Sequence, residues 1–496
     1  MVDRFKDAAV ANISVIELQH PRPGDRIGII TLIVAGLALM VLSTALAWQA
    51  PGLTGHGHPD LLQREIVVAG SVAAGVVFLV SCLALRTAQP RWMLFWVLLV
   101  GLACRLLLLA APPVMASDYY RYMWDGTVWL HGYNPWRFSP AAALAGSPTR
   151  IPAGLHELAV NHRKFIRRIN HNKLPTIYPP VSEAVFVAAA WMGPFNTVAL
   201  KAWLFFFDGA TAAVLALLLS RLKLPGWLLL IYWWNPVVIN AFANEAHLDS
   251  ITLFFVTLFL YFLLSSARHA QVGAGVALGL AIGAKFWPVV LGLVVLRKYW
   301  KQPRRLFTVT LATVASAVIA LAPMFATGPP AFISLSAYAR YWQANDLVFH
   351  LLFMLWRHLV TAWPAAHLGA VATILTVYGI AALVLMRQSA DGVRAIRTSL
   401  YLTALIFLLS PTEFPWYYTW LVPMLVFCPR PSLLLWSCTL GLYHWAYFGA
   451  WVVWVEHLPV ILLFVVESFS SRARLFLDFG APTTRLDMIT ASEAAQ

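Results

Sequence analysis

Apolar segments long enough to cross a lipid bilayer recur along most of this chain, and they constrain its fold more than any other feature. A transmembrane helix needs about 20 mostly apolar residues, and the first such run extends from Ile27 to Trp48. Of the 496 residues, 60% are hydrophobic and 11% are charged, which is more apolar surface than a soluble domain can bury. The sequence therefore predicts an all-α, polytopic membrane protein, a single domain over residues 1–496 with about 12–14 transmembrane helices.

The Lys and Arg residues orient these spans, because cytoplasmic loops carry an excess of both. Counting spans from a cytoplasmic N-terminus places residues 113–180 outside as a long loop with short interfacial helices, and residues 471–496 inside as a cytoplasmic tail. The net charge of +14 is explained mainly by the cytoplasmic loops and does not indicate a nucleic-acid partner. The basic residues that predict the N-terminal orientation are Arg4, Lys6, Arg22 and Arg26.

Three segments depart from a simple crossing. Val272–Leu296 has basic clusters on both sides, so a helical hairpin with its tip near Lys285 keeps both clusters inside. Val181–Met192 is short and Leu347–Trp363 is interrupted by charge, so both are predicted to be re-entrant or interfacial. The other predicted spans are Ile27–Trp48, Ile66–Leu85, Trp92–Ala111, Val198–Ser220, Trp227–Phe242, Ile251–Leu264, Leu306–Phe325, His367–Met386, Leu400–Leu409, Tyr417–Phe427, Leu433–Tyr447 and Val452–Val466.

The longest polar interval of the chain opens with the stretch 117–140, directly after the third apolar segment. If its first part is helical, Asp118, Arg121 and Asp125 share one face, beside Tyr122. The simpler interpretation is an interfacial amphipathic helix with solvated charges. Because the other polar motifs fall on the same external side, we favour a catalytic loop.

The same external loop breaks the positive-inside tendency. A misassigned topology would explain this, and so would an anionic ligand outside the membrane. Four of its basic residues show i, i+4 spacing, which predicts a helix that lies on lipid headgroups or binds a lipid phosphate. These residues are Arg163, Lys164, Arg167 and Arg168.

Further polar residues occur at the external ends of later spans. The turn at residues 244–249 carries Glu245, His247 and Asp249, which are candidates for substrate contacts or, alternatively, for metal ligation. Lys285 lies within an apolar run, which is costly unless its ammonium group faces water or an anion. Its alternative is snorkelling from a helix end.

The late segment PTEFPWYY, residues 411–418, is rich in aromatic side chains around one carboxylate. It could form an interfacial belt at headgroup level, or a platform on which a sugar stacks. The residues singled out for substrate contact are Glu413, Trp416 and Tyr417.

Taken in order, the motifs DYYRYMWDG, GYNP, TIYPP, AHLD, AKFWP and SPTEFPWYY resemble the polytopic GT-C glycosyltransferases. They are most similar to the polyprenyl-phosphate-mannose-dependent mannosyltransferases of glycosyltransferase family 87 and their actinobacterial relatives, over roughly residues 91–425. The resemblance implies an inverting sugar transfer with the first-loop carboxylate as base, a role that falls on Asp118. The turn departs from the Gly-His/Gln-Asn-Asp form of the relatives, because Ala246 and Leu248 replace the Gly and the Asn.

The expected chemistry assigns a role to each candidate. Asp118 takes a proton from the acceptor hydroxyl, and cations compensate the charge of the departing lipid phosphate. No metal and no cofactor are expected, the polyprenyl-phosphate sugar being the donor substrate. The predicted substrate-binding residues are Arg121, Asp125, Tyr122, His247, Asp249, Lys285, Glu413, Trp416 and Tyr417, with Arg163, Lys164, Arg167 and Arg168 for a lipid phosphate or headgroup.

Two functions compete at this point. A transporter or flippase for a polar or lipid-linked substrate would more often show inverted repeats and charges at the bilayer midplane. This sequence shows no internal repeat, and its polar motifs gather on one face. We therefore expect a glycosyltransferase in the inner (plasma) membrane, with its active site on the periplasmic or external side. It would move a hexose such as mannose to a lipid or glycan acceptor, among membrane lipids.

Overall fold

The described part of the chain is helical and has one isolated β-bridge, a parallel contact between Ala344 and Thr412. The predicted all-α class is therefore confirmed. The basic residues Arg4, Lys6 and Arg22 and the predicted tail 471–496 lie outside the described residues. The computed structural model describes residues 23–53, 61–85, 89–147 and 149–469.

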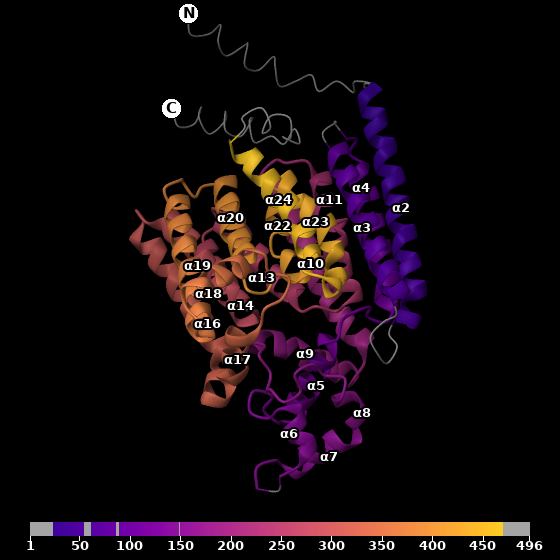
Figure 1. The fold of residues 1–496 in the computed structure, drawn as a ribbon. Helices are drawn as coiled ribbons and strands as arrows, with labels where there is room; N and C mark the ends of the chain where they lie inside the picture. The colour runs from indigo at the N-terminus through magenta and orange to yellow at the C-terminus, as the bar shows by residue number, and fades with distance from the viewer. Residues whose placement is uncertain (1–22, 54–60, 86–88, 148, 470–496) are drawn as a thin grey trace, which may run out of the picture.

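The long apolar helices form one bundle (Figure 1). A bent pair, Gly226–Trp233 and Pro236–Asn244, meets at 60° and adds one broken span if its halves are counted together. By length and composition, seven of the described helices can cross a membrane, or up to eight with that pair. The seven are α2 (Pro23–Leu53), α3 (Leu61–Ala84), α4 (Met93–Ala110), α10 (Thr197–Arg221), α16 (Pro303–Ala326), α19 (Trp363–Leu385) and α24 (Trp451–Phe469).

The number of long helices is smaller than the predicted 12–14 spans because several predicted spans consist of shorter elements. Many of the apolar side chains of these elements are buried. The apolar runs are interrupted by proline and glycine, which end helices early. These elements are α13 (Asp249–Leu263), α14 (Ala270–Ala284), η3 (Trp287–Leu291), α15 (Gly292–Tyr299), α18 (Val348–Leu359), α20 (Val393–Leu409), α21 (Pro415–Tyr418), α22 (Val422–Leu425), α23 (Pro431–Thr439) and η5 (Leu440–Phe448).

The predicted hairpin at residues 272–296 is present. Glycines of α14 contact small residues of α16, and the pairs Gly275–Ala312 and Gly279–Ser316 advance along both helices in the same direction. Because α14 and α16 run in the same direction, the segment between them must run in the opposite direction. That segment is η3 followed by α15. Small residues allow this close approach, and an added Cβ at either glycine would clash with α16. Lys285 therefore lies at the tip between α14 and η3.

A buried ion pair holds the bent span in place. The helix breaks around Asn235 and Pro236, and a break leaves backbone carbonyls without helical partners. The Arg105 guanidinium donates to the carbonyl of Trp233 at 2.7 Å and pairs with Asp208 at 2.5 Å. The second half of this bent segment leads directly into the polar turn 244–249. The contacts of Arg105 therefore also position that turn.

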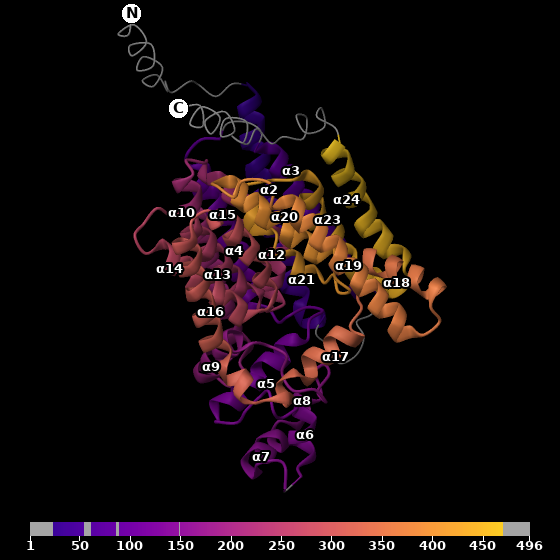
Figure 2. The ribbon, with the colours of Figure 1, turned by 90° about the vertical axis from the view of Figure 1, so that its left-hand side faces the viewer.

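The loop predicted to be external folds into a separate layer of short helices, which is called the external layer after that prediction. Figures 1 and 2 show it at one end of the bundle, with α17 beside it. Tyr122 stacks on Phe186 with ring centroids 4.6 Å apart, and Gly126 crosses the α9 backbone too closely for any side chain. The elements of this layer are α5 (Asp118–Leu130), α6 (Pro140–Ala145), α7 (Ala153–Asn161), α8 (Arg163–Ile166), α9 (Pro180–Met192), η4 (Pro329–Phe332) and α17 (Ile333–Tyr341).

Candidate active site

A cavity of about 1060 Å³ lies between the external layer and the bundle. Segments far apart in sequence meet there, including the start of α5, the loop 168–179, the turn 245–249 and the tip at Lys285. It collects most of the predicted site residues, and five of them do not line it. Those that line it are Asp118, Arg121, Tyr122, Arg168, His247, Asp249, Lys285, Trp416 and Tyr417; those that do not are Asp125, Arg163, Lys164, Arg167 and Glu413.

Asp118 is the first residue of α5, where the helix dipole favours a carboxylate. Its side chain remains 32% exposed, and its Oδ2 lies 3.9 Å from Nδ1 of His247. On the other edge of that imidazole, Nε2 lies 3.2 Å from the Glu245 carboxylate. Asn240 donates to Glu245 at 2.7 Å. The result is a line of polar groups, from Asn240 in the bundle to Asp118 at the cavity.

The backbone of the turn explains how these side chains converge. Residues Asn240–Asn244 form a π-helical turn, a feature often found at functional sites. Ala246 then adopts a φ of 62°, the left-handed region that glycine occupies without strain. The glycine of the Gly-His/Gln-Asn-Asp motif would therefore adopt this conformation without strain, whereas Ala246 adopts it at a cost in backbone strain.

Lys285 and Asp249 form an ion pair in the wall of the same cavity. Lys285 Nζ lies 2.6 Å from Asp249 Oδ1, which also accepts a 2.5 Å hydrogen bond from the indole of Trp420. The ammonium lies over the rings of Tyr417 and Trp420, at 4.1 Å and 4.9 Å from their centroids. A cation over ring faces is stabilised by the ring quadrupoles. Lys285 is thus oriented by its surroundings and is not a snorkelling residue.

Two stacks of aromatic rings connect the segment 414–420 to these polar groups. Trp416 lies between Phe414 and His247, with ring centroids 4.5 Å and 3.9 Å away. In the second stack, Trp420 lies between Tyr417 at 4.6 Å and Trp287 at 5.0 Å. One stack ends on the imidazole of His247 and the other underlies Lys285, so this segment sets the orientation of both.

Sequence reasoning missed Trp420, Trp287 and Phe414 as site residues. Trp287 and Phe414 lie within the motifs AKFWP and PTEFPWYY, and Trp420 follows the second of these by two residues. The signal was the aromatic density of both segments. Which ring would stack on which polar group could not be read from spacing, because the partners come from different spans.

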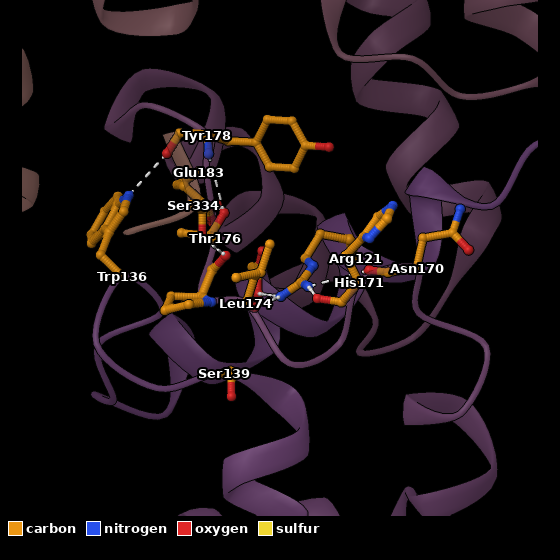
Figure 3. Close-up of polar contacts among 12 residues, drawn as sticks. Arg121, Trp136, Ser139, Asn170, His171, Leu174, Thr176, Tyr178, Glu183 and Ser334 are labelled. Carbon is orange, nitrogen blue, oxygen red and sulfur yellow. Dashed lines mark hydrogen bonds and ion pairs between the residues drawn. The ribbon is translucent and has the colours of Figure 1, made fainter. Parts of the chain in front are cut away.

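Arg121 uses its guanidinium to shape the cavity wall. It donates to the carbonyl oxygens of Leu174 at 3.0 Å and His171 at 2.9 Å, and its side chain is 9% exposed (Figure 3). Trp136 donates to the Tyr178 carbonyl at 2.9 Å in the same view. These bonds satisfy backbone carbonyls of an irregular loop. Arg121 is therefore at least a positioning residue for the loop that lines the cavity.

Asp125 lies beneath the cavity and is fully enclosed. Its carboxylate is 3.8 Å from Arg121, while Thr176 donates to the neighbouring Glu183 at 2.6 Å (Figure 3). Burial raises the pKa of Asp125 to about 6, against the opposing effect of Arg121. Burial and then the Asp125 charge raise the pKa of Glu183 well above its usual range. Burial thus favours the protonated form of both carboxyl groups. Sequence reasoning had not singled out Glu183.

Glu413 points away from the cavity, contrary to its predicted place among the substrate contacts. Its carboxylate is buried and lies 2.8 Å from Nε2 of His457 on α24. Asn345 donates to the Glu413 carbonyl at 3.1 Å and to Glu456 at 2.7 Å. A buried carboxylate needs a partner of this kind. Glu413 thus fastens the segment 411–418 to α24.

The basic cluster of the external loop is divided. α8 is only four residues long, and Arg163, Lys164 and Arg167 are exposed on it or just after it, outside the cavity. Arg168 lines the cavity and donates to the hydroxyl of Tyr120 at 3.1 Å. Contact of the first three with lipid headgroups stays a prediction. No group of three His, Cys, Asp or Glu side chains suited to a metal ion occurs within the described ranges.

Comparison with known proteins identifies part of the chain. Residues 176–411 match the model of glycosyltransferase family 87. The match covers the turn 244–249 and Lys285, and it excludes Asp118 and the segment 414–420. No curated protein and no solved structure matches this chain significantly.

Proposed function

We propose, on the premise that residues 176–411 of this chain belong to glycosyltransferase family 87, that the protein is an inverting, polyprenyl-phosphate-dependent hexosyltransferase. The family indicates a glycosyltransferase, and the chain is a polytopic membrane protein. The proposed donor is a polyprenyl-phosphate hexose such as mannose, and the acceptor a lipid or a glycan. The observation that carries the proposal is one cavity lined by a half-exposed carboxylate, Asp118, and by an oriented cation, Lys285.

In the proposed reaction, the acceptor hydroxyl attacks the anomeric carbon of the donor sugar. The new C–O bond forms as the bond to the phosphate oxygen breaks, and polyprenyl phosphate leaves with that electron pair. Asp118 accepts the hydroxyl proton, because its carboxylate is at the cavity surface and can reach a group that arrives from water. Attack opposite to the leaving group inverts the anomeric configuration.

Lys285 suits the leaving phosphate. An ammonium group has three N–H donors, and Asp249 accepts from one of them. The remaining donors can bind phosphate oxygens, whose negative charge increases as the bond to the sugar breaks. Tyr417 and Trp420 hold the cation without neutralising it.

His247 and Glu245 support the proposed base. His247 is buried between Trp416 and the Asp118 carboxylate, and Glu245 contacts its far edge. A carboxylate at one edge of an imidazole restrains the orientation of the ring. Glu245 and Trp416 would therefore hold His247 with its Nδ1 edge toward Asp118.

The position of the cavity supports a transferase over a transporter. It lies at one end of the bundle, under the external layer, where a lipid-linked donor and a water-borne acceptor can meet. A transport site is expected near the bilayer midplane between repeats. We propose that this end faces the periplasm or cell exterior, as the distribution of Lys and Arg favours.

Purified protein in vesicles with a radiolabelled polyprenyl-phosphate hexose tests the function. We expect label to pass to an extractable glycolipid or glycan fraction from cells of the source organism. Accumulation of substrate inside the vesicles without a new glycosidic product would instead identify a transporter. An Asp118→Asn sample, prepared in parallel, controls for label transfer by contaminating enzymes.

A further inference from the structure

A second hollow lies at the opposite end of α14 from the cavity. α14 has 15 residues, so its two ends are about 22 Å apart at 1.5 Å per residue. The hollow is an open depression of about 250 Å³ between the start of α14 and the start of α16. Three of its lining residues are Arg268, Arg304 and Arg305, and no Asp or Glu is among the residues that line it.

The three guanidinium groups make no hydrogen bond or ion pair with another residue in the described part of the chain. Basic residues close by in sequence behave differently. Arg297 donates to the Gln388 carbonyl at 2.8 Å, and Lys298 lies 3.3 Å from Asp391. Orientation of the spans requires only that basic residues lie on this side. It does not require three of them to border one hollow.

Two helix N-termini add to this positive charge. α14 and α16 run parallel and in close contact through Gly275 and Gly279, and residues at the start of each border the same hollow. No side chain caps either N-terminus. Helix N-termini carry partial positive charge and unpaired N–H groups, so parallel packing brings like charges together unless an anion offsets them.

The surface below the hollow is apolar. Phe307 and Leu311, on the first turns of α16, are 67% and 54% exposed, and Val314 and Val318 continue this exposed row down the helix. Phe307 is two residues from Arg305. A phospholipid whose phosphate occupied the hollow would therefore lay an acyl chain along α16. A soluble anion would make no use of that row.

We propose that this hollow binds the phosphate group of an anionic phospholipid, in the leaflet opposite the cavity. Basic pockets between transmembrane helices bind anionic headgroups in this way, and Arg binds phosphate in a bidentate geometry. Lipid binding here would need neither the sugar donor nor the acceptor. The hollow lies where α13 ends and where α14 and α16 begin. A bound lipid would therefore hold the base of the hairpin whose tip carries Lys285.

Native mass spectrometry of the delipidated full-length protein tests this site. Phosphatidylglycerol is compared with phosphatidylcholine of identical chains, and inorganic phosphate is added alone and as a competitor. Arg268→Gln/Arg304→Gln/Arg305→Gln should weaken phosphatidylglycerol binding by roughly 100-fold, at about a factor of five for each charge removed. The matched control removes three charges from the neighbouring basic loop: Arg387→Gln, Arg394→Gln and Arg397→Gln.

The proposal is overturned if the two triple variants lose equal affinity, if neither loses any, or if phosphatidylcholine binds as well as phosphatidylglycerol. Binding of inorganic phosphate as tight as that of phosphatidylglycerol, with the same loss in the first variant, would also overturn the lipid occupant and identify a site for a soluble anion. If the Gln variant does not fold, Arg268→Lys/Arg304→Lys/Arg305→Lys keeps the charge and loses the bidentate geometry. It should show a smaller loss of the same kind.

Discussion

Helix α5 carries two aspartates seven residues apart, and their surroundings differ in nearly every respect. Asp118 keeps 32% of its side chain exposed and faces the cavity near His247. Asp125 is 1% exposed and lies beside Arg121 and near Glu183, whose pKa is raised by burial. A proton acceptor has to meet a hydroxyl group that arrives from outside, whereas an enclosed carboxyl group can act only on its own scaffold. One helix thus carries a candidate base at its start and a structural carboxyl group two turns further along.

The largest expected effect separates these two aspartates. Asp118→Asn keeps the size of the side chain and removes the proton acceptor, so kcat should fall by about 10²–10⁴-fold. Asp125→Asn is the matched control, and its kcat should stay within a few-fold of the parent value. Steady-state transfer assays at saturating donor measure both.

The opposite pattern, with Asp125→Asn inactive and Asp118→Asn active, would show that the exposed carboxylate is not the base. If both variants transfer sugar normally, the base lies elsewhere, and Asp249 is the next carboxylate in the cavity.

A second comparison separates two of the cations that line the cavity, Lys285 and Arg121. Lys285→Met should raise the donor KM about 10–100-fold, because a charged hydrogen bond to phosphate contributes about 1.5–3 kcal/mol. Arg121→Met should instead lower the melting temperature with a smaller change in KM, since its donors already hold the carbonyls of Leu174 and His171.

Because Lys285→Met leaves a buried carboxylate without its partner, the double variant with Asp249→Asn serves as its control. Equal rises in donor KM for Lys285→Met and Arg121→Met, with unchanged melting temperatures, would assign Arg121 to the phosphate as well.

A smaller effect is expected for Trp420→Phe. The ring of the stack is retained and one hydrogen bond to Asp249 is lost, which should lower kcat/KM by about tenfold. Trp287→Phe is the control, because the Trp287 indole N–H has no partner among the described residues. Kinetics with varied donor distinguish the two, and equal effects would mean that only ring size is important.

The smallest predicted effect is on the pH dependence of the free energy of unfolding. Burial raises the Asp125 pKa from 3.8 to about 6, so between these values the folded state binds more protons than the unfolded state. Stability should therefore fall as pH rises through this window, by about 1 kcal/mol per pH unit. Asp125→Asn should flatten that slope in unfolding measurements in detergent between pH 4 and 7. An unchanged slope would mean that Asp125 is already ionised throughout this range.

Much of the site could be predicted from sequence, for a reason that applies to apolar chains in general. A polar group within or beside a membrane span is costly unless it faces water or a partner. Asp118, His247 and Asp249 stood out as polar residues beside apolar runs, and Lys285 as a cation within one. All four line one cavity. The hairpin around Lys285 followed from basic residues on both of its flanks.

Other features were outside the reach of sequence reasoning. Glu413 carried the same local signal as Asp249, yet it faces His457 on α24, 44 positions later in the chain. Arg121 had the spacing of a ligand-binding cation and is engaged by the carbonyls of its own loop. Local spacing sets which residues share a helix face. It does not set which distant backbone or side chain approaches that face.

The sequence by itself determined that this chain is an all-α membrane protein with polar motifs gathered at one end, because hydrophobicity and charge act on each segment separately. Only the tertiary structure decided which carboxylate is exposed, which cation is already engaged, and that two parallel helices place three arginines around one hollow. These outcomes depend on contacts between segments tens to hundreds of residues apart, and burial at those contacts decides what a charged side chain can do.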